Sequence, residues 1–552
     1  MAGLKLPMKV LSRTATGLLL TGFLGACGGD DTSSPAASLP EGGAREAVGM
    51  PPAVMPPEAI PPELQPALRF AHFVERTELA QAGVLERVKR NLRYMHITDM
   101  QLVDDDAPFP MRVGLLDEVF AATISTGGER PQEEYADEIM ASLVQVVNLE
   151  HQDDPFAFAI HTGDNIDNGL ENEAMRYLDL IDGHHTTVGP ISGLSCQPDG
   201  QSQSTEDFFN DQTFNCTSLP ETVVDSVTGF SADLPSFISI GNHDLLVQGN
   251  VAIEPSFQEL ALLYGRHFLH EDELIRMHFA DLTPCNGGSA DDDYGHGFGF
   301  VDEVRRCDAD VENDGYYAFL SGGILHIVLN TVNDDIFQTN EYTAFLPDES
   351  VTGHDLVTGL SEGALDLTQW AWLKSMIEAH SDKLVILYSH HTINSFYSSQ
   401  FDALCGPPGC VNDVLSAAGF VGRDEVRAQL DQYPNLLAWI GGHTHQHRIT
   451  PFLSDSTDGF WNIETAGLLD LPQENRTIEI WIDEQARKGV IAVDPITHNF
   501  ELAREIAMTD SQHNAEVAAG EPGDRSALLW FDIEEGITLP AVADTPPTPV
   551  FE

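Results

Sequence analysis

Residues 435–445 read Asn-Leu-Leu-Ala-Trp-Ile-Gly-Gly-His-Thr-His. The apolar run that opens this stretch has the length and composition of a buried β-strand. Gly441 and Gly442 then allow the backbone to turn tightly, so that His443 and His445 leave the end of the strand. Neutral imidazole is the commonest protein ligand for transition metals. Taken alone, the stretch predicts either a strand that ends in a metal site or a loop with two surface histidines.

Four other predicted strands also end in polar residues. The strands and the residues that follow them are 93–98 with Asp99 and Gln101, 156–162 with Asp164 and Asp167, 234–240 with Asn242, His243 and Asp244, and 383–389 with His390 and His391. A single turn of this kind is most often only a capped turn. An open α/β sheet, however, assembles its site at the carboxyl edge of its strands. Five such strand ends in one chain therefore favour a shared metal site over five surface loops.

Predicted helices alternate with these strands. The helices span residues 135–150, 367–380 and 423–432, and further strands are predicted at 316–320, 324–330, 460–465, 477–482 and 527–531. This alternation is typical of a layered α/β protein in which helices cover sheets. Two polar, cysteine-bearing stretches, at about 183–233 and 280–313, lack periodicity and are interpreted as surface insertions.

In its strand-end motifs the chain resembles the calcineurin-like metallophosphoesterase superfamily. The family's motifs run D-x-H, GDxxD, GNHD, a lone His after a strand and GHxH, and the chain shows counterparts in that order over roughly residues 90–470. Residues 242–249 also resemble an exported bacterial branch of the superfamily. The resemblance implies a four-layer α/β/β/α sandwich with surface insertions. We expect this domain at residues 67–510, followed by a C-terminal extension at 511–552.

The resemblance also implies two divalent metal ions, of Mn, Fe, Zn or Mg, and a small phosphoester substrate. Asp164 would bridge the ions; the implied ligands are Asp99 and His445 for the first ion, with Gln101 at the family's further ligand position, and Asn242, His390 and His443 for the second. His243 would serve the leaving-group oxygen, with Asp167 orienting its ring, and His391 would either contact substrate or pack. A hydroxide held between the ions would attack phosphorus in line, in a monoester or a diester.

Gln101 departs from the family pattern, which has histidine at this position. An amide oxygen is a neutral and weaker donor, although it can bind iron, manganese or magnesium. The departure leaves open a second interpretation, in which the chain is a surface-tethered binding or scaffold protein with a weakened metal site. His96, on the preceding strand, is interpreted as a packed core residue rather than as a substitute ligand.

Charge excludes one class of partner. The 552 residues include 87 acidic and 27 basic ones, for a formal net charge of −60. Such a field repels nucleic acid and anionic membranes, so we expect no nucleic-acid patch. No obligate protein partner is evident from the sequence.

The N-terminus predicts export. Lys5, Lys9 and Arg13 precede a short apolar run that ends in Leu24-Gly-Ala-Cys27, which resembles the bacterial lipobox. Residues 1–27 are therefore predicted to be a lipoprotein signal with Cys27 as the lipid attachment site. Residues 28–66 are rich in Pro, Gly and Ala and are predicted to be a linker. We expect a periplasmic or cell-surface protein that contacts the membrane only through its lipid.

Cysteine usage agrees with an extracytoplasmic location. Beyond Cys27 there are six cysteines, and an even number outside the cytosol predicts disulfides. Six cysteines allow 15 pairings. Neighbours in the sequence are the simplest choice: Cys196 with Cys216, Cys285 with Cys307 and Cys405 with Cys410.

Overall fold

In the computed structural model, all of the helices and strands described below belong to one unit. The described residues are 69–104, 130–183, 229–249, 266–279, 315–332, 362–398, 419–454, 459–509, 515–540 and 547–550, with short pieces at 187–188, 194–198, 214–218, 222–223, 253, 258, 261, 296–297 and 415–416. The predicted signal peptide, the linker and Cys27 lie outside these residues.

Two large mixed sheets form the centre of the unit. The first sheet has the strand order β1 (Val74–Arg76), β19 (Ala527–Asp532), β18 (Lys488–Thr497), β17 (Glu474–Asp483), β2 (Lys89–Ile97), β3 (Ala159–Thr162) and β8 (Ser236–Ser239). The second sheet has the order β15 (Arg448–Phe452), β16 (Phe460–Glu464), β14 (Leu436–Gly441), β12 (Val385–Tyr388), β10 (Ile324–Val328), β9 (Tyr317–Ser321) and β20 (Thr548–Val550). Strands β2, β3 and β8 are parallel neighbours, and so are β10, β12, β14 and β16.

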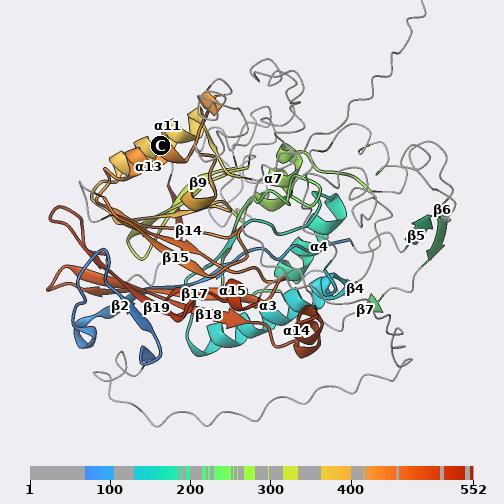
Figure 1. The fold of residues 1–552 in the computed structure, drawn as a ribbon, viewed down its shortest axis with the longest axis horizontal. Helices are drawn as coiled ribbons and strands as arrows, with labels where there is room; N and C mark the ends of the chain where they lie inside the picture. Colours follow the sequence, from blue (N-terminus) through green and yellow to red (C-terminus); the bar gives the residue numbers. More distant parts are fainter. Residues whose placement is uncertain are drawn as a thin grey trace, which may run out of the picture. The chain divides into compact units, whose positions relative to one another are not determined.

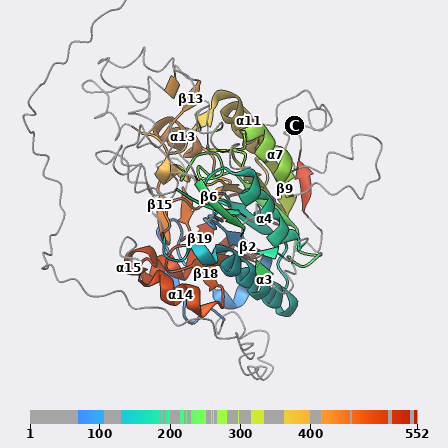
Figure 2. The same cartoon turned by 90° about the vertical axis from the view of Figure 1, so that its right-hand side faces the viewer.

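Helices cover the outer faces of both sheets. The predicted helices are found as α3 (Ala136–Asp153), α11 (Leu367–Ala379) and α13 (Arg423–Leu430), and the structure adds α4 (Glu171–Asp182), α7 (Glu271–Phe279) and α14 (Glu501–Ala507). Figure 1 shows α11 and α13 on one side, the two sheets in the middle, and α3 with α14 on the other side. The view in Figure 2, turned by 90°, shows the same sequence of layers.

The side chains of the second sheet alternate between two cores, as the period of two in a β-strand requires. Leu325 and Leu387 pack with Trp370 of α11, whereas Val328 and Tyr388 belong to the core shared with the first sheet. Each strand therefore carries apolar residues on both faces, because helices cover one face and a sheet covers the other. This arrangement confirms the predicted four-layer α/β/β/α sandwich.

Aromatic rings fill the space between the sheets. Tyr94 of β2 stacks on Phe158, with ring centroids 4.7 Å apart, and Phe158 meets the ring of His326 on β10 at 5.1 Å. His326 is fully buried, and its Nδ1 lies 3.0 Å from the hydroxyl of Tyr388. The two sheets are thus joined by large rigid side chains, including one neutral imidazole.

The C-terminal residues complete both sheets. Residues that the sequence placed in an extension after 510 form β19, between β1 and β18, and β20, beside β9. Strand β18, which the sequence did not predict, pairs along ten residues with β17. Residues 527–532 and 548–550 are therefore structural parts of the sandwich.

The first predicted insertion contains two small β-ribbons. One of them pairs β5 (Leu194–Pro198) with β6 (Phe214–Ser218) in antiparallel fashion, and its register places Cys196 opposite Cys216. The other four predicted disulfide cysteines lie outside the described residues, as does the second insertion except for residues 296–297. Disulfide pairing stays a prediction.

No helix within the described ranges combines the length and the apolar composition needed to cross a lipid bilayer.

We predict that His326 makes the fold sensitive to acid. Burial lowers the pKa of His326 to about 3, below the ordinary value of 6.5. The unfolded chain therefore binds a proton that the folded chain excludes, so stability falls as the pH drops from 6.5 towards 3, by about 1.4 kcal/mol per pH unit at most. Guanidinium denaturation between pH 4 and pH 7 should show a smaller pH slope in His326→Gln than in the wild type. The matched control is His72→Gln, at a histidine whose side chain is 59% exposed; an unchanged slope in His326→Gln would contradict the prediction.

Candidate metal centre

The predicted ligands come together where strands of the two sheets end. Asp99 and Gln101 follow β2, Asp164 follows β3 and Asn242 follows β8, all three strands being neighbours in the first sheet. His390 follows β12, while His443 and His445 follow β14, its neighbour in the second sheet. Because these neighbouring strands are parallel, their carboxyl ends meet at one edge of each sheet.

The backbone at these strand ends is strained. Eight non-glycine residues have positive φ in the described part of the chain, and five of them are predicted ligands: Asp99, Gln101, Asp164, His443 and His445. Left-handed conformations cost of order 1–3 kcal/mol each for such residues and persist only when the surroundings enforce them. Backbone hydrogen bonds supply that enforcement: the Gln101 N–H donates to the Asp164 carbonyl at 2.8 Å, and the Gly442 N–H donates to the His390 carbonyl at 3.0 Å. The concentration of strain marks the site independently of its side chains.

One group of donor atoms surrounds Asp99. His445 Nε2 lies 3.1 Å from a carboxylate oxygen of Asp99. Asp164 completes this group, and one ligand atom from each of the three residues lies within 4.8 Å of the other two. Both carboxylates are buried, with exposed fractions of 0% for Asp99 and 1% for Asp164.

A second group surrounds His443. Its Nδ1 lies 3.1 Å from Asn242 Oδ1 and 3.3 Å from His390 Nε2. His390 Nε2 in turn lies 3.2 Å from Asp164 Oδ2, so the Asp164 carboxylate contacts both groups. His391, whose role the sequence left open, contributes a ring nitrogen to this group together with His390 and His443.

The contacts of Gln101 show whether these residues fit a metal ion. Its Oε1 is buried and has no hydrogen-bond partner, while its amide nitrogen lies 3.3 Å from His445 Nε2 and 3.4 Å from Asp164 Oδ2. The two ends of a carboxamide have nearly the same shape, and a half-turn of the amide directs Oε1 to the point on which the other two donors converge. An unsatisfied buried oxygen beside two converging donors fits a divalent cation better than it fits an empty protein core.

The charges of the two groups also suit a cation. Burial would raise the pKa of the Asp164 carboxyl, but His390 and His243 hold that pKa well below its usual range. Burial and then the neighbouring His390 lower the pKa of His443 to about 3, which keeps its imidazole neutral and able to donate an electron pair. Burial opposes the charged forms of His390 and His445, yet Asp164 raises the pKa of His390 to about 9 and Asp99 raises that of His445 to about 10. The centre therefore presents ionised carboxylates and one neutral imidazole, and a cation would displace a proton from each of the other two rings.

His243 and Asp167 form a pair at the rim of the centre. His243 Nδ1 lies 3.0 Å from Asp167 Oδ1, and its Nε2 lies 3.8 Å from Asp164 Oδ2. Burial opposes the charged imidazole, yet Asp164 and Asp167 raise the pKa of His243 above its ordinary value. The geometry leaves Nε2 facing the centre while Asp167 holds the opposite side of the ring.

The structure adds residues that the sequence did not indicate. Asp470 accepts a hydrogen bond from His445 Nδ1, the Thr162 carbonyl accepts one from His390 Nδ1 at 2.9 Å, and Arg130 forms ion pairs with both Asp167 and Asp470. A carboxylate soon after the predicted strand 460–465 was the only available signal for Asp470. Arg130 stands outside every motif and gave no signal.

His96 is a packed core residue, as predicted. Its Nε2 lies 2.8 Å from the Thr162 hydroxyl and its Nδ1 lies 3.0 Å from the Thr465 hydroxyl, so both ring nitrogens are occupied. It therefore offers no nitrogen to a metal ion in place of a ligand at position 101.

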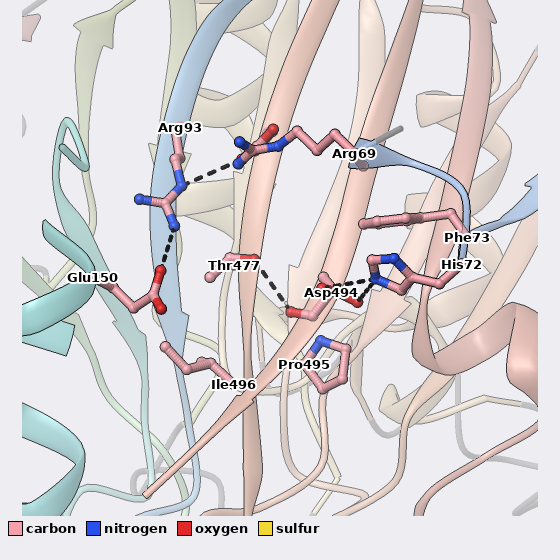
Figure 3. A pocket seen from close by; sticks show the side chains of 11 residues that line it. Arg69, His72, Phe73, Arg93, Glu150, Thr477, Asp494, Pro495 and Ile496 are labelled. Carbon is pink, nitrogen blue, oxygen red and sulfur yellow. Dashed lines mark hydrogen bonds and ion pairs between the residues drawn. The ribbon is translucent and has the colours of Figure 1, made fainter. Parts of the chain in front are cut away.

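A separate cavity of about 230 Å³ lies on the outer face of the first sheet (Figure 3). Its lining includes Arg69, Arg93 and His72, which pair with Glu479, Glu150 and Asp494 respectively. Both arginines of this lining have carboxylate partners, and none of the predicted site residues lines the cavity.

A family model described as calcineurin-like phosphoesterase (Metallophos) matches residues 92–447, which is more than half of the chain. The chain belongs to the calcineurin-like phosphoesterase family. Membership indicates a hydrolase, and the two groups of donors lie where the family motifs occur in the sequence. A search of curated proteins found no match.

For this calcineurin-like phosphoesterase we predict that Gln101 limits metal affinity. Gln101→His supplies an imidazole in place of an amide oxygen and should strengthen binding of Zn²⁺ or Mn²⁺ by on the order of tenfold, whereas Gln101→Ala should weaken it by a similar factor. Competition with a coloured chelator measures both constants on metal-free protein. Equal affinity in Gln101→Ala and the wild type would show that Gln101 is not a ligand.

Proposed function

We propose that this protein is a metal-dependent phosphoester hydrolase that acts on a small phosphomonoester or phosphodiester. The observation that carries the proposal is the convergence of seven strand-end side chains at one buried centre, together with the His243–Asp167 pair beside it. Asp99, Gln101, Asp164 and His445 would hold one divalent cation, and Asp164, Asn242, His390 and His443 would hold the other. When bound, such cations stabilise negative charge on phosphoryl oxygens and activate water at neutral pH.

Three further roles in catalysis would fall to side chains of the protein. Asp164, ionised and shared by both groups of donors, would fix the distance between the two cation positions. His243 would donate a proton or a hydrogen bond to the leaving-group oxygen, since Asp167 holds its Nδ1 and leaves Nε2 directed at the centre. His391 would contact substrate from the second group, although its Nδ1 already lies 3.0 Å from the Thr331 hydroxyl.

The alternative, a binding or scaffold protein with a damaged site, rests on Gln101 alone. The His243–Asp167 pair is evidence against the scaffold alternative. Keeping an imidazole and a carboxylate buried is costly unless they are paired, and a scaffold gains nothing from directing the imidazole at a metal site. Hydrolysis therefore accounts for more of the observed arrangement.

Export and lipid tethering belong to the proposal as well. Residues 1–27 support them through three basic residues, a short apolar run and the lipobox-like Leu24-Gly-Ala-Cys27. A periplasmic or cell-surface hydrolase of the exported bacterial branch would meet small phosphoesters outside the cytoplasm, attached through Cys27. An anionic substrate must approach a chain of net charge −60, so the cations of the centre would have to reverse the local field.

Hydrolysis of bis-p-nitrophenyl phosphate and p-nitrophenyl phosphate, with Mn²⁺, Fe²⁺, Zn²⁺ or Mg²⁺, tests the function. The wild type should turn over at least one ester, and the ratio of the two rates will separate diesterase from monoesterase. Asn242→Ala should lower the rate at least roughly a hundredfold through loss of a ligand. His243→Ala should lower kcat by about 10²- to 10⁴-fold through loss of the proton donor.

A matched control is Asn148→Ala, which removes a half-buried asparagine from α3 that holds Gly229 and Ser231. This variant should keep its activity. Failure of metal-loaded wild type to hydrolyse either ester, combined with no effect of Asn242→Ala, would favour the scaffold.

A further inference from the structure

Arg130 is a buried cation beside the metal centre that no motif of the chain announces. It lies just before the short 3₁₀ helix η3 (Glu133–Tyr135), which leads into α3, and its exposed fraction is 4%. Burying a guanidinium is costly unless carboxylates pair with it. Arg130 has three such partners: Glu133, Asp167 and Asp470.

The two partners outside its own segment lie in loops that follow strands of different sheets. Arg130 Nη1 lies 3.4 Å from Asp167 Oδ1, in the loop after β3 of the first sheet. Arg130 Nε lies 2.9 Å from Asp470 Oδ1, in the loop that follows β16 of the second sheet. One planar guanidinium therefore joins loops that are about 300 positions apart in the sequence.

Each of these carboxylates also holds a histidine of the centre. Asp167 Oδ1 lies 3.0 Å from His243 Nδ1, and Asp470 Oδ2 accepts from His445 Nδ1. In each case the other ring nitrogen, Nε2, faces the centre: His243 Nε2 lies 3.8 Å from Asp164, and His445 Nε2 lies 3.1 Å from Asp99. The hydrogen bond at one ring nitrogen decides the orientation and the tautomer of the whole imidazole.

We propose that Arg130 is a positioning residue that sets His243 and His445 relative to one another through Asp167 and Asp470. This inference rests on the proposed function, in which His445 holds a cation and His243 serves the leaving group. Arg130 supplies the positive charge that two buried carboxylates need, and each of these ion pairs holds a carboxylate in place beside its histidine. The distance between the metal site and the proton donor is thereby fixed by a side chain that contacts neither cation nor substrate.

Neighbouring contacts add to the ion pairs of Arg130. We refer to residues 130–133 together with Asp167 and Asp470 as the clamp. Gln132 donates to Asp470 Oδ1 at 3.3 Å and to the Leu469 carbonyl at 3.2 Å. Glu133 accepts from the Arg130 backbone N–H at 3.0 Å, which fixes the start of the segment. Residues 130–133 therefore contact the loop at 469–470 at several points, and Arg130 also forms an ion pair with Asp167.

A second buried arginine provides the matched control. Arg266 is also 4% exposed, and its Nε and Nη2 lie 2.9 and 3.3 Å from the two carboxylate oxygens of Asp104. No contact in the described residues links Asp104 to a histidine of the centre. Arg266→Met therefore removes a buried guanidinium of the same kind without touching the histidine supports.

The experiment measures two quantities on Arg130→Met, Arg130→Lys and Arg266→Met. The first is the affinity of metal-free full-length protein for Mn²⁺ and Zn²⁺, by chelator competition. The second is kcat and KM at saturating metal. Arg130→Met should weaken the binding step that involves His445 by roughly tenfold and should lower kcat by roughly 10- to 100-fold, with KM changing less than about threefold.

Three further variants separate the contributions of the charge at position 130 and of each carboxylate partner. Arg130→Lys should recover most of the lost affinity because it keeps the positive charge, although it lacks the planar fork. Asp470→Asn should lower metal affinity more than kcat, and Asp167→Asn should lower kcat more than metal affinity. These three variants keep side-chain volume nearly constant, so they report on the clamp even if Arg130→Met does not fold.

The proposal is overturned if Arg130→Met and Arg266→Met behave alike, with affinity and kcat near wild type and only the melting temperature reduced. Equal effects of Asp167→Asn and Asp470→Asn on both quantities would also overturn it. If the wild type binds metal but hydrolyses no ester, the proposed function fails, and the affinity measurement still decides whether Arg130 positions His445.

Discussion

Two buried carboxylates, Asp99 and Asp164, impose the central constraint on this structure. Both are almost completely inaccessible to solvent, and both stay ionised against the cost of burial. Negative charge of this density in a protein interior requires opposite charge at hydrogen-bonding distance. In the absence of metal, imidazolium groups supply it, since His445 lies beside Asp99 and His390 beside Asp164. Bound divalent cations would take over that role, because an imidazole must be neutral to act as a ligand.

The close approach of the strand ends, between the sheets at Gly442 and within the first sheet at Gly241, depends on glycine at these two positions. A Cβ atom added to Gly442 would overlap the Asp99 carboxylate and the Thr98 hydroxyl, and one added to Gly241 would overlap the Asp164 backbone and side chain. The glycines that precede His443 and Asn242 are thus needed for close approach and not only for a turn. Because the strand ends can approach so closely, short side chains such as those of Asp99 and Asn242 reach a common point.

Beyond the donors lies a second set of contacts that fixes their orientation. The Thr162 carbonyl holds His390, Asp470 holds His445, and the Gly249 carbonyl accepts from the Asn242 amide at 2.9 Å. Each contact occupies one polar atom of a ligand and leaves the other directed at the centre. Arg130 joins two branches of this set, so in the proposed mechanism metal binding and proton donation would share one support. His390, His445 and Asn242 are each held by a contact that does not involve Gln101, so the proposed hydrolase would keep these ligands in place with glutamine at position 101.

The sequence by itself determined the donors of the centre, because each stands directly after a short apolar strand and local order is enough to place it there. It also determined the layered α/β class, through alternating strand and helix periodicities and through the family resemblance that supplied the number of layers. Only the tertiary structure decided how β18, β19 and β20 complete the sheets, since the pairing partner of a strand is not encoded in the strand's own pattern. Only the tertiary structure placed Arg130 between Asp167 and Asp470, because a buried ion pair between distant loops depends on how the chain folds back and leaves no periodic trace in the sequence.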